Sequence, residues 1–269
     1  METKTTFNEI FELLKNKKVY FFDLDGTLYL EDLLFEGILN LINKLKSLDK
    51  KIFFLSNNSS ISTKEYLLKL EKLGLDINIE NIILSTHPTI QYLKKKKVKK
   101  IYLLGTKSLQ SEFIEEGFEI TDKDPEIVVL GFDKELTYEK LVKVSYFLQD
   151  NLPYIATHPD KVCPTRKGYI PDAGAIISLL YEATGKKPKI FGKPNKEMLL
   201  FKLRELKISP KDAVIVGDRL YTDIRMGKEA GVTTICVFSG ETSREMIEKS
   251  EIKPDIVLNK ATDLIKILK

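Results

Sequence analysis

Residues 18–28 read Lys-Val-Tyr-Phe-Phe-Asp-Leu-Asp-Gly-Thr-Leu, and this stretch decides the fold of the 269-residue chain. The apolar run from Val19 to Phe22 is rich in β-branched and aromatic residues, which is typical of a strand buried on both faces of a parallel sheet. Two acids, Asp23 and Asp25, follow the run directly. We therefore expect the strand to deliver two carboxylates at its carboxyl end, the edge where ligands bind in open α/β sheets.

Gly26 and Thr27 complete the stretch with a predicted tight turn whose backbone N–H groups suit an anion. An isolated Asp-Gly pair is more simply interpreted as an ordinary turn. Here the pair follows a buried strand and a preceding acid, so a functional site is the favoured interpretation.

The composition indicates a globular protein with reduced thiols and no polymeric partner. Hydrophobic residues make up 43% of the chain, which is enough for a substantial core, and the net charge is only +4. The densest basic run, Lys94 to Lys100, has no interleaved aromatic residues, so a solvated helix end is favoured over a nucleic-acid site. Cys163 and Cys236 show no metal-ligand spacing, and Cys236 is expected in the core. No signal peptide or membrane span is recognisable, so we expect a cytoplasmic protein without membrane contact.

Apolar runs and helical patterns alternate on either side of a long insert. Residues 36–48 and 62–73 have the spacing of amphipathic helices, the second beginning with a Ser-x-x-Glu capping box and ending at Gly74. Between them, residues 51–55 read as another buried strand. This order predicts right-handed βαβ units and therefore a parallel sheet.

A second α/β domain is expected at residues 84–186, inserted into a first domain made of residues 1–83 and 187–269. The insert shows its own alternation of strands and helices, followed by a Pro- and Gly-rich loop at residues 157–174. The first domain is expected to resume at Pro188 to Phe191. Strands are predicted within the insert at 100–104, 126–130 and 153–156, and after it at 213–216, 233–237 and 255–258.

Four groups of polar residues follow predicted strands. Because parallel strands share one carboxyl edge, these groups can converge on one ligand. They would supply a carboxylate nucleophile, a second acid, hydroxyl and amide donors, a cation and metal-binding carboxylates, which is the set that phosphoryl transfer requires. Each group alone could also be a turn or a helix cap. The groups are Asp23 with Asp25, Ser56-Asn57-Asn58, Lys193, and Asp218 with Asp223.

Asp23-Leu24-Asp25-Gly26-Thr27 resembles the first motif of the haloacid dehalogenase (HAD) superfamily, and the other three groups resemble its remaining motifs in the right order. The resemblance covers the whole chain. It implies a Rossmann-like parallel-sheet core with an inserted α/β cap between the second and third motifs. Gly131-Phe132-Asp133 and residues 156–160, Ala-Thr-His-Pro-Asp, are similar to subfamily IIA, the NagD and para-nitrophenylphosphatase branch.

We expect Asp23 to attack phosphorus and form an aspartyl-phosphate, and Asp25 to protonate the leaving alkoxide and then activate water. A carboxylate that attacks a phosphate dianion needs charge neutralisation, for which Mg2+ is the expected cofactor. Asp23 and Asp218 are the expected side-chain ligands, and the resemblance implies that the backbone carbonyl of Asp25 is another. Asp223 is expected to order the metal's surroundings through water or hydrogen bonds.

The resemblance further implies that Ser56, Asn57 and Asn58 bind phosphate oxygens and that Lys193 pairs with phosphate and with Asp23. In the insert, His158 and Asp160 are candidate substrate contacts, with ordinary loop structure as an equal alternative. Arg166 and Tyr169 are weaker candidates.

Two features of the insert depart from patterns in the family. Pro171-Asp172-Ala173-Gly174 stands where Pro-Gly-x-Gly is frequent, and Cys163 stands where similar pyridoxal phosphatases hold a histidine. The cysteine at this position weakens an assignment to pyridoxal phosphate.

The resulting hypothesis is a Mg2+-dependent phosphatase of small phosphorylated metabolites. Nucleotides, sugar or glycerol phosphates, phosphoglycolate and, in vitro, para-nitrophenyl phosphate are the substrate classes that the resemblance implies. Asp25 argues for ester hydrolysis, because dehalogenases and P-type ATPases with a similar motif lack the second acid. A phospho-accepting signalling module and a non-catalytic phosphometabolite-binding protein remain as alternatives. The resemblance is compatible with a homodimer formed through the cap.

Overall fold

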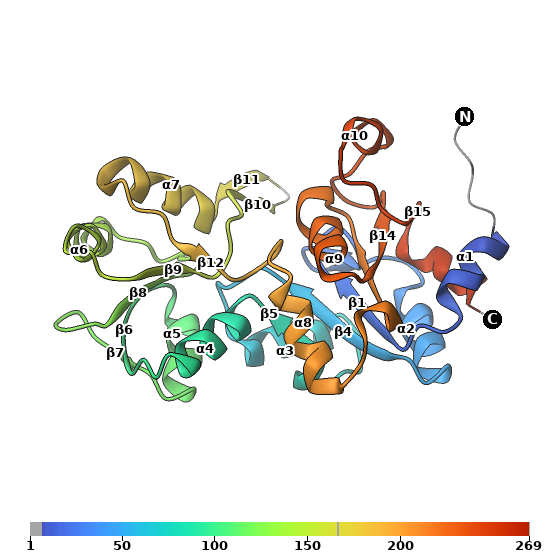
Figure 1. Cartoon of the computed structure of the whole chain (residues 1–269), viewed down its shortest axis with the longest axis horizontal. Helices are drawn as coiled ribbons and strands as arrows, with labels where there is room; N and C mark the ends of the chain where they lie inside the picture. The colour runs from blue at the N-terminus through green and yellow to red at the C-terminus, as the bar shows by residue number, and fades with distance from the viewer. Residues whose placement is uncertain (1–6, 166, 269) are drawn as a thin grey trace. The chain divides into compact units, whose positions relative to one another are not determined.

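The computed structural model describes residues 7–165 and 167–268, which form two compact units (Figure 1). Unit 1 contains the described residues up to Ser56, Leu70–Ile83 and the residues from Leu199 onward. Unit 2 contains Asn57–Lys69 and Leu84–Met198. Contacts therefore place residues 57–69 and 187–198 in unit 2, although the sequence assigns them to the first domain. The division into a catalytic core and a cap, with boundaries at residues 84 and 186, stays a prediction.

Unit 1 is built around a six-stranded sheet in the order β15-β14-β13-β1-β4-β5. β1 is central and completely buried, as its apolar sequence predicts, and it pairs in parallel with β13 on one side and β4 on the other. The predicted parallel sheet is thus confirmed. The strands are β1 (Val19–Asp23), β4 (Lys51–Ser56), β5 (Ile82–Leu84), β13 (Ala213–Gly217), β14 (Thr233–Val237) and β15 (Ile256–Leu258).

The helices of unit 1 bury one apolar face each where their sequence is amphipathic. In α2 (Ile38–Ser47) the residues Ile38, Leu41, Ile42 and Leu45 are buried, as the helical spacing predicts. A short hairpin of β2 (Tyr29–Leu30) and β3 (Leu33–Leu34), which is too short to show periodicity, follows β1. The remaining helices of unit 1 are α1 (Phe7–Leu14), α9 (Arg225–Ala230), α10 (Arg244–Lys249) and α11 (Leu264–Ile267). Two helices, α3 (Thr63–Lys72) and α8 (Glu197–Leu206), run from unit 2 into unit 1.

Unit 2 has three layers, with a sheet in the order β12-β9-β8-β6-β7 between two pairs of helices (Figure 1). Alternate strand residues point to opposite faces, so Ile101 and Leu103 join one core with α4 and α5, while Tyr102 and Leu104 join another with α6 and α7. The strands are β6 (Lys100–Leu104), β7 (Glu119–Ile120), β8 (Ile127–Leu130), β9 (Tyr154–Ala156) and β12 (Lys189–Ile190). The helices are α4 (Thr86–Lys95), α5 (Lys107–Glu115), α6 (Tyr138–Gln149) and α7 (Ala173–Thr184).

One local expectation is wrong, and one segment pairs in a way that the sequence does not show. The segment Pro188 to Phe191 contains β12, which pairs in parallel with β9 of unit 2 and not with a strand of the six-stranded sheet. The segment 157–174 is not all loop, since β10 (Val162–Thr165) and β11 (Gly168–Pro171) form an antiparallel hairpin. Every residue of β11 is exposed, so its sequence carries no alternation of apolar and polar residues that would signal a strand. Every helix in the described part of the chain is too short or too polar to span a membrane.

Candidate active site

Three carboxylates meet at the carboxyl edge of the unit 1 sheet. Asp23 ends β1, and Asp218 directly follows the neighbouring strand β13. Asp223 lies in a π-helical turn, Leu220–Ile224, which brings its side chain back toward the strand end. Oxygen atoms of the three carboxylates all lie within 4.8 Å of one another, and all three side chains are buried. The structure thus brings together the carboxylates of Asp23 and Asp218, which the sequence predicts as ligands, and places the carboxylate of Asp223 beside them.

This cluster carries an electrostatic cost that a cation would remove. Burial, followed by the charges of Asp23 and Asp223, raises the pKa of Asp218 well above its usual range. One oxygen of Asp218, Oδ2, accepts a hydrogen bond of 2.7 Å from the backbone N–H of Glu241. The other, Oδ1, is buried without a hydrogen-bond partner. Three converging carboxylates with an unsatisfied oxygen fit a hard divalent cation, for which carboxylate oxygens are the preferred ligands.

Two glycines let the backbone close around Asp218. Gly26 has a φ of +87°, and a Cβ atom there would lie 2.6 Å from Asp218 Oδ2. Gly240 approaches the same carboxylate even more closely. Any larger residue at either position would collide with Asp218, so the glycine predicted to form a turn after Asp25 is also required by this close approach.

Hydroxyl groups orient the two acids of the first motif. Thr27 Oγ1 donates to Asp23 Oδ2 at 3.0 Å, and the buried Tyr29 donates through its hydroxyl to Asp25 Oδ2 at 3.3 Å. Asp25 itself is half-buried and lies outside the three-carboxylate cluster. Asp23 and Asp25 thus have different environments, which suits a nucleophile and a proton donor.

Arg219 is a residue of the site that the sequence analysis did not single out. Its Nε lies 3.0 Å from Glu241 Oε2, which also accepts a hydrogen bond from the Tyr221 hydroxyl. Burial opposes the charge of Arg219, yet the carboxylates of Asp23 and Asp218 raise the pKa of the guanidinium overall. Arg219 therefore supplies a fixed positive charge that offsets part of the cluster's negative charge. Its position in the sequence between Asp218 and Asp223, both predicted site residues, is the feature that could have identified it.

In unit 2, Asn57 and Lys193 are held together. Lys193 is buried, and its backbone N–H donates to Asn57 Oδ1 at 2.8 Å. The amide nitrogen of Asn57 donates to the Lys193 carbonyl and to Asp160 Oδ2, both at 3.1 Å. This side chain could bind a phosphate oxygen through its N–H groups only by giving up one of these bonds.

The other residues of the second motif are fixed locally. Ser56 ends β4 and is buried. Asn58 Oδ1 accepts hydrogen bonds from both the backbone N–H and the hydroxyl of Ser60, each at 2.8 Å. Phosphate binding by Ser56 and Asn58 stays a prediction.

The candidate substrate contacts of the insert differ in exposure. His158 is fully buried, with Asp160 and Asp172 on either side of its ring, so a substrate contact would first require this residue to become exposed. Burial is the main cause that raises the pKa of Asp172. Tyr169 is exposed on β11, Cys163 is partly exposed on β10, and Arg166 lies outside the described residues.

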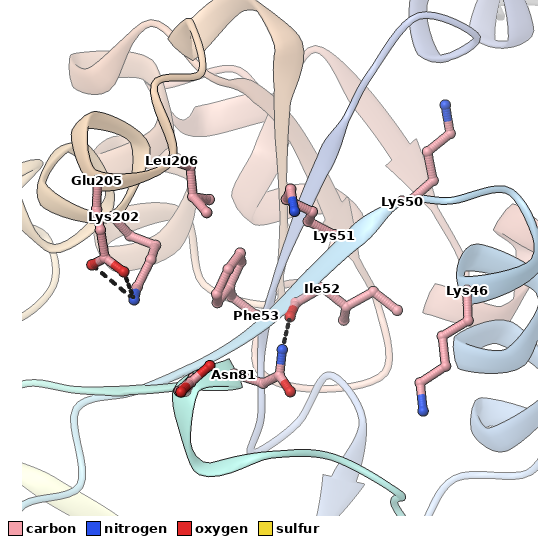
Figure 2. Close-up of a pocket in the computed structure, with 10 residues that line it drawn as sticks. Lys46, Lys50, Lys51, Ile52, Phe53, Asn81, Lys202, Glu205 and Leu206 are labelled. Carbon is pink, nitrogen blue, oxygen red and sulfur yellow. Dashed lines mark hydrogen bonds and ion pairs between the residues drawn. The ribbon is translucent and has the colours of Figure 1, made fainter.

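A cavity of about 310 Å3 in unit 1 lies at the opposite end of β4 from Ser56 (Figure 2). Lys51 and Ile52, at the beginning of that strand, contribute to its wall. Figure 2 shows Lys202 paired with Glu205, and Asn81 donating to the carbonyl of Ile52. The cavity therefore belongs to the amino edge of the sheet and contains none of the predicted site residues.

Known proteins match this chain over most of its length. A sequence model described as haloacid dehalogenase-like hydrolase matches residues 20–119, and one described as HAD-hydrolase-like matches residues 190–264. An acid sugar phosphatase of Staphylococcus haemolyticus is 32% identical over 243 residues, 90% of this chain and 92% of that protein.

Solved structures match both units. The crystal structure of a 4-nitrophenylphosphatase from Thermotoga maritima has a TM-score of 0.92 and 39% identity, covering 96% of this chain and 99% of that one. NagD from Escherichia coli K-12 has a TM-score of 0.85 and 28% identity, covering 92% and 98%.

A parallel sheet with acidic groups at its carboxyl edge, joined to an inserted α/β unit, defines a hydrolase of small phosphate esters. The chain belongs to the haloacid dehalogenase-like hydrolase family, as a phosphomonoesterase of its subfamily IIA.

The charge repulsion in the cluster predicts the effect of Asp218→Asn. Because the pKa of Asp218 is higher in the folded than in the unfolded chain, folding stability is lost as the pH rises toward the folded pKa. At neutral pH the metal-free variant should therefore melt a few degrees above the metal-free wild type. Added Mg2+ should raise the Tm of the wild type and leave the variant nearly unchanged. Thermal melts with and without Mg2+ check both effects, and a metal-free variant that melts below the wild type would contradict the repulsion.

Proposed function

We propose that this chain is a Mg2+-dependent phosphatase that hydrolyses phosphomonoesters of small metabolites through an aspartyl-phosphate on Asp23. The observation that supports it most is the buried cluster of Asp23, Asp218 and Asp223 beside the separately oriented Asp25. The phosphatases matched above, which their names assign to sugar phosphates and nitrophenyl phosphate, support the same reaction class.

In the proposed first step, a carboxylate oxygen of Asp23 attacks phosphorus while the bond to the leaving oxygen breaks. Asp25 gives its proton to that leaving oxygen, so an alcohol departs. In the second step Asp25 takes a proton from water, the water oxygen attacks phosphorus, and the bond to Asp23 breaks. Inorganic phosphate is released, and both acids return to their starting states.

The carboxylates of Asp23 and Asp218 and the carbonyl of Asp25 would hold Mg2+, with Asp223 as a further carboxylate of the same cluster. The ion would neutralise phosphate charge that otherwise repels the carboxylate nucleophile. Thr27 keeps Asp23 oriented, and Arg219 limits the cost of ionising all three acids. We assign Ser56, Asn58 and Lys193 to the phosphate group.

We further propose that residues 84–186 act as a cap that selects substrates, within a cytoplasmic enzyme that forms a homodimer through this cap. The four sequence motifs lie outside this range, so the insert is not required to supply the reacting groups. Its hairpin β10–β11 exposes Tyr169 and leaves Cys163 partly exposed, as expected of a surface that reads the organic part of a substrate.

The experiment that tests the proposed function is hydrolysis of para-nitrophenyl phosphate by the wild type and by Asp23→Asn. Turnover should require Mg2+, stop in excess EDTA, and fall below detection in the variant, because the nucleophile is lost with little change of shape. Repeated turnover, rather than a stable phosphorylated protein, separates the enzyme from a signalling module. Activity that persists in EDTA would contradict the metal assignment.

Asp25→Asn should reduce turnover severely, and more for an alkyl phosphate such as glycerol phosphate than for para-nitrophenyl phosphate. The aryl leaving group departs as a stable anion and depends less on a proton donor. The ratio of kcat between the two substrates measures this contrast. Equal losses for both would argue against the acid role of Asp25.

Substitutions on the hairpin should change substrate ranking. Cys163→Ser and Tyr169→Ala should alter kcat/KM differently for sugar, nucleotide and glycerol phosphates, and affect para-nitrophenyl phosphate least, because it offers few groups to recognise. A panel of phosphorylated metabolites provides the measurement. A uniform decrease for every substrate would mean that the hairpin has only a structural role.

A further inference from the structure

The side chain of Asn57 is committed to other protein groups. An asparagine amide offers two N–H donors and one oxygen. Both donors are used, one on the carbonyl of Lys193 at 3.1 Å and one on Asp160 Oδ2 at 3.1 Å. The oxygen accepts the backbone N–H of the same lysine at 2.8 Å. The Asn57 side chain is therefore hydrogen-bonded to both the N–H and the carbonyl of the Lys193 backbone.

Only one orientation of this amide is compatible with its neighbours. If the oxygen and nitrogen of Asn57 were exchanged, the oxygen would face the Lys193 carbonyl and the Asp160 carboxylate, and the nitrogen would face the Lys193 N–H. Each contact would then join two acceptors or two donors. The three partners thus fix the amide against rotation.

The residue before Lys193 is a glycine, and this allows the backbone to come close enough to Asn57 for these hydrogen bonds. A Cβ atom on Gly192 would lie 2.6 Å from Asn57 Oδ1 and 2.6 Å from the carbonyl of Thr157. The N–H of Gly192 donates to that same Thr157 carbonyl, and the backbone carbonyl of Asn57 accepts the hydroxyl of Ser85 at 2.8 Å. The backbone that carries Lys193 is therefore fixed by two contacts, one from Gly192 to Thr157 and one from Lys193 to Asn57.

Asp160, the third partner of the amide, is itself held by its surroundings. The Nδ1 atom of His158 lies 3.7 Å from Asp160 Oδ2, and its Nε2 atom lies 3.6 Å from Asp172 Oδ1. Asp172 caps helix α7, and the N–H of Gly174 in that helix donates to the Asp160 carbonyl at 2.7 Å. The beginning of α7 thus anchors the residue that orients Asn57.

We propose that Asn57 is a positioning residue for Lys193, and that Asp160, whose backbone is held by the beginning of α7, fixes the Asn57 amide. Asn57 and Asp160 then serve the reaction through the lysine and not by touching substrate. This inference rests on the proposed function, in which the Lys193 ammonium binds phosphate. A lysine side chain has many rotamers, so a fixed backbone origin limits where its charge can lie, and small displacements of catalytic groups are costly.

A double-mutant cycle between Asn57 and Lys193 tests this proposal. Lys193→Met removes the charge while keeping most of the side-chain length. Asn57→Ala should lower kcat/KM for para-nitrophenyl phosphate by about 100-fold and weaken inhibition by inorganic phosphate. In the Lys193→Met background, Asn57→Ala should cost at most about threefold more, because the group it positions is already gone. Losses that multiply in the double variant would show an independent role for Asn57 and would overturn the proposal.

Asp160 provides a second and milder cycle. Asp160→Asn keeps an oxygen acceptor for the Asn57 amide and should retain most activity, whereas Asp160→Ala should lose about tenfold. Asp160→Ala should also add little to Lys193→Met. If Asn57→Ala does not fold, this cycle decides the question, and multiplicative losses here would likewise overturn the proposal.

Asn81→Ala is the matched control, because Asn81 also donates from its side chain to a backbone carbonyl, that of Ile52, at 3.0 Å. Asn81 lies near the beginning of β4, at the opposite end of that strand from Ser56, so this variant should change Tm without changing kcat. If wild-type turnover is absent, the proposed function fails. If Lys193→Met has wild-type activity, the role of Lys193 in binding phosphate fails, and the positioning role of Asn57 fails with it. An active wild type with an impaired Lys193→Met variant and multiplicative losses rejects the positioning role alone.

Discussion

Three carboxylates that repel one another are buried at one edge of the unit 1 sheet, and the groups around them hold them there. Asp23 and Asp218 are neighbours because β1 and β13 are paired strands, and both strands end there. Gly26 and Gly240 allow the surrounding backbone to come near Asp218, and Arg219 supplies a nearby positive charge. Folding thus brings together groups that repel each other without a cation. Such an arrangement is expected at a site where charge must be stabilised during a reaction.

The second and third motifs show a different principle, in which the side chain of Asn57 is fixed by other groups of the protein. Asn57 follows Ser56 directly in the chain, yet its amide is hydrogen-bonded to the backbone of Lys193, far away in sequence. The bond to Asp160 ties this pair to the loop before the hairpin of the insert. A change in that loop therefore has a physical route to the lysine, through contacts within unit 2.

Much of the fold could be predicted, because buried parallel strands such as β1 read as continuous apolar runs and acids follow them. The pairing of β12 with β9 could not, because a two-residue strand carries too little pattern to select its sheet. The sequence could place Asp223 near the cluster, but only the π-helical turn shows that its carboxylate joins the other two. Likewise, a Ser-Asn-Asn motif does not reveal that the N–H groups and the oxygen of the Asn57 amide are hydrogen-bonded to Lys193 and Asp160.

The most direct test of the central claim is calorimetric titration of the wild-type protein with Mg2+ in buffers of different ionisation enthalpy. The raised pKa of Asp218 means that the metal must displace a proton once the pH approaches that pKa. We predict one ion per chain, with proton release that grows as the pH is lowered from neutral. Binding of Mg2+ without any proton release across this range, or no binding at all, would contradict the account.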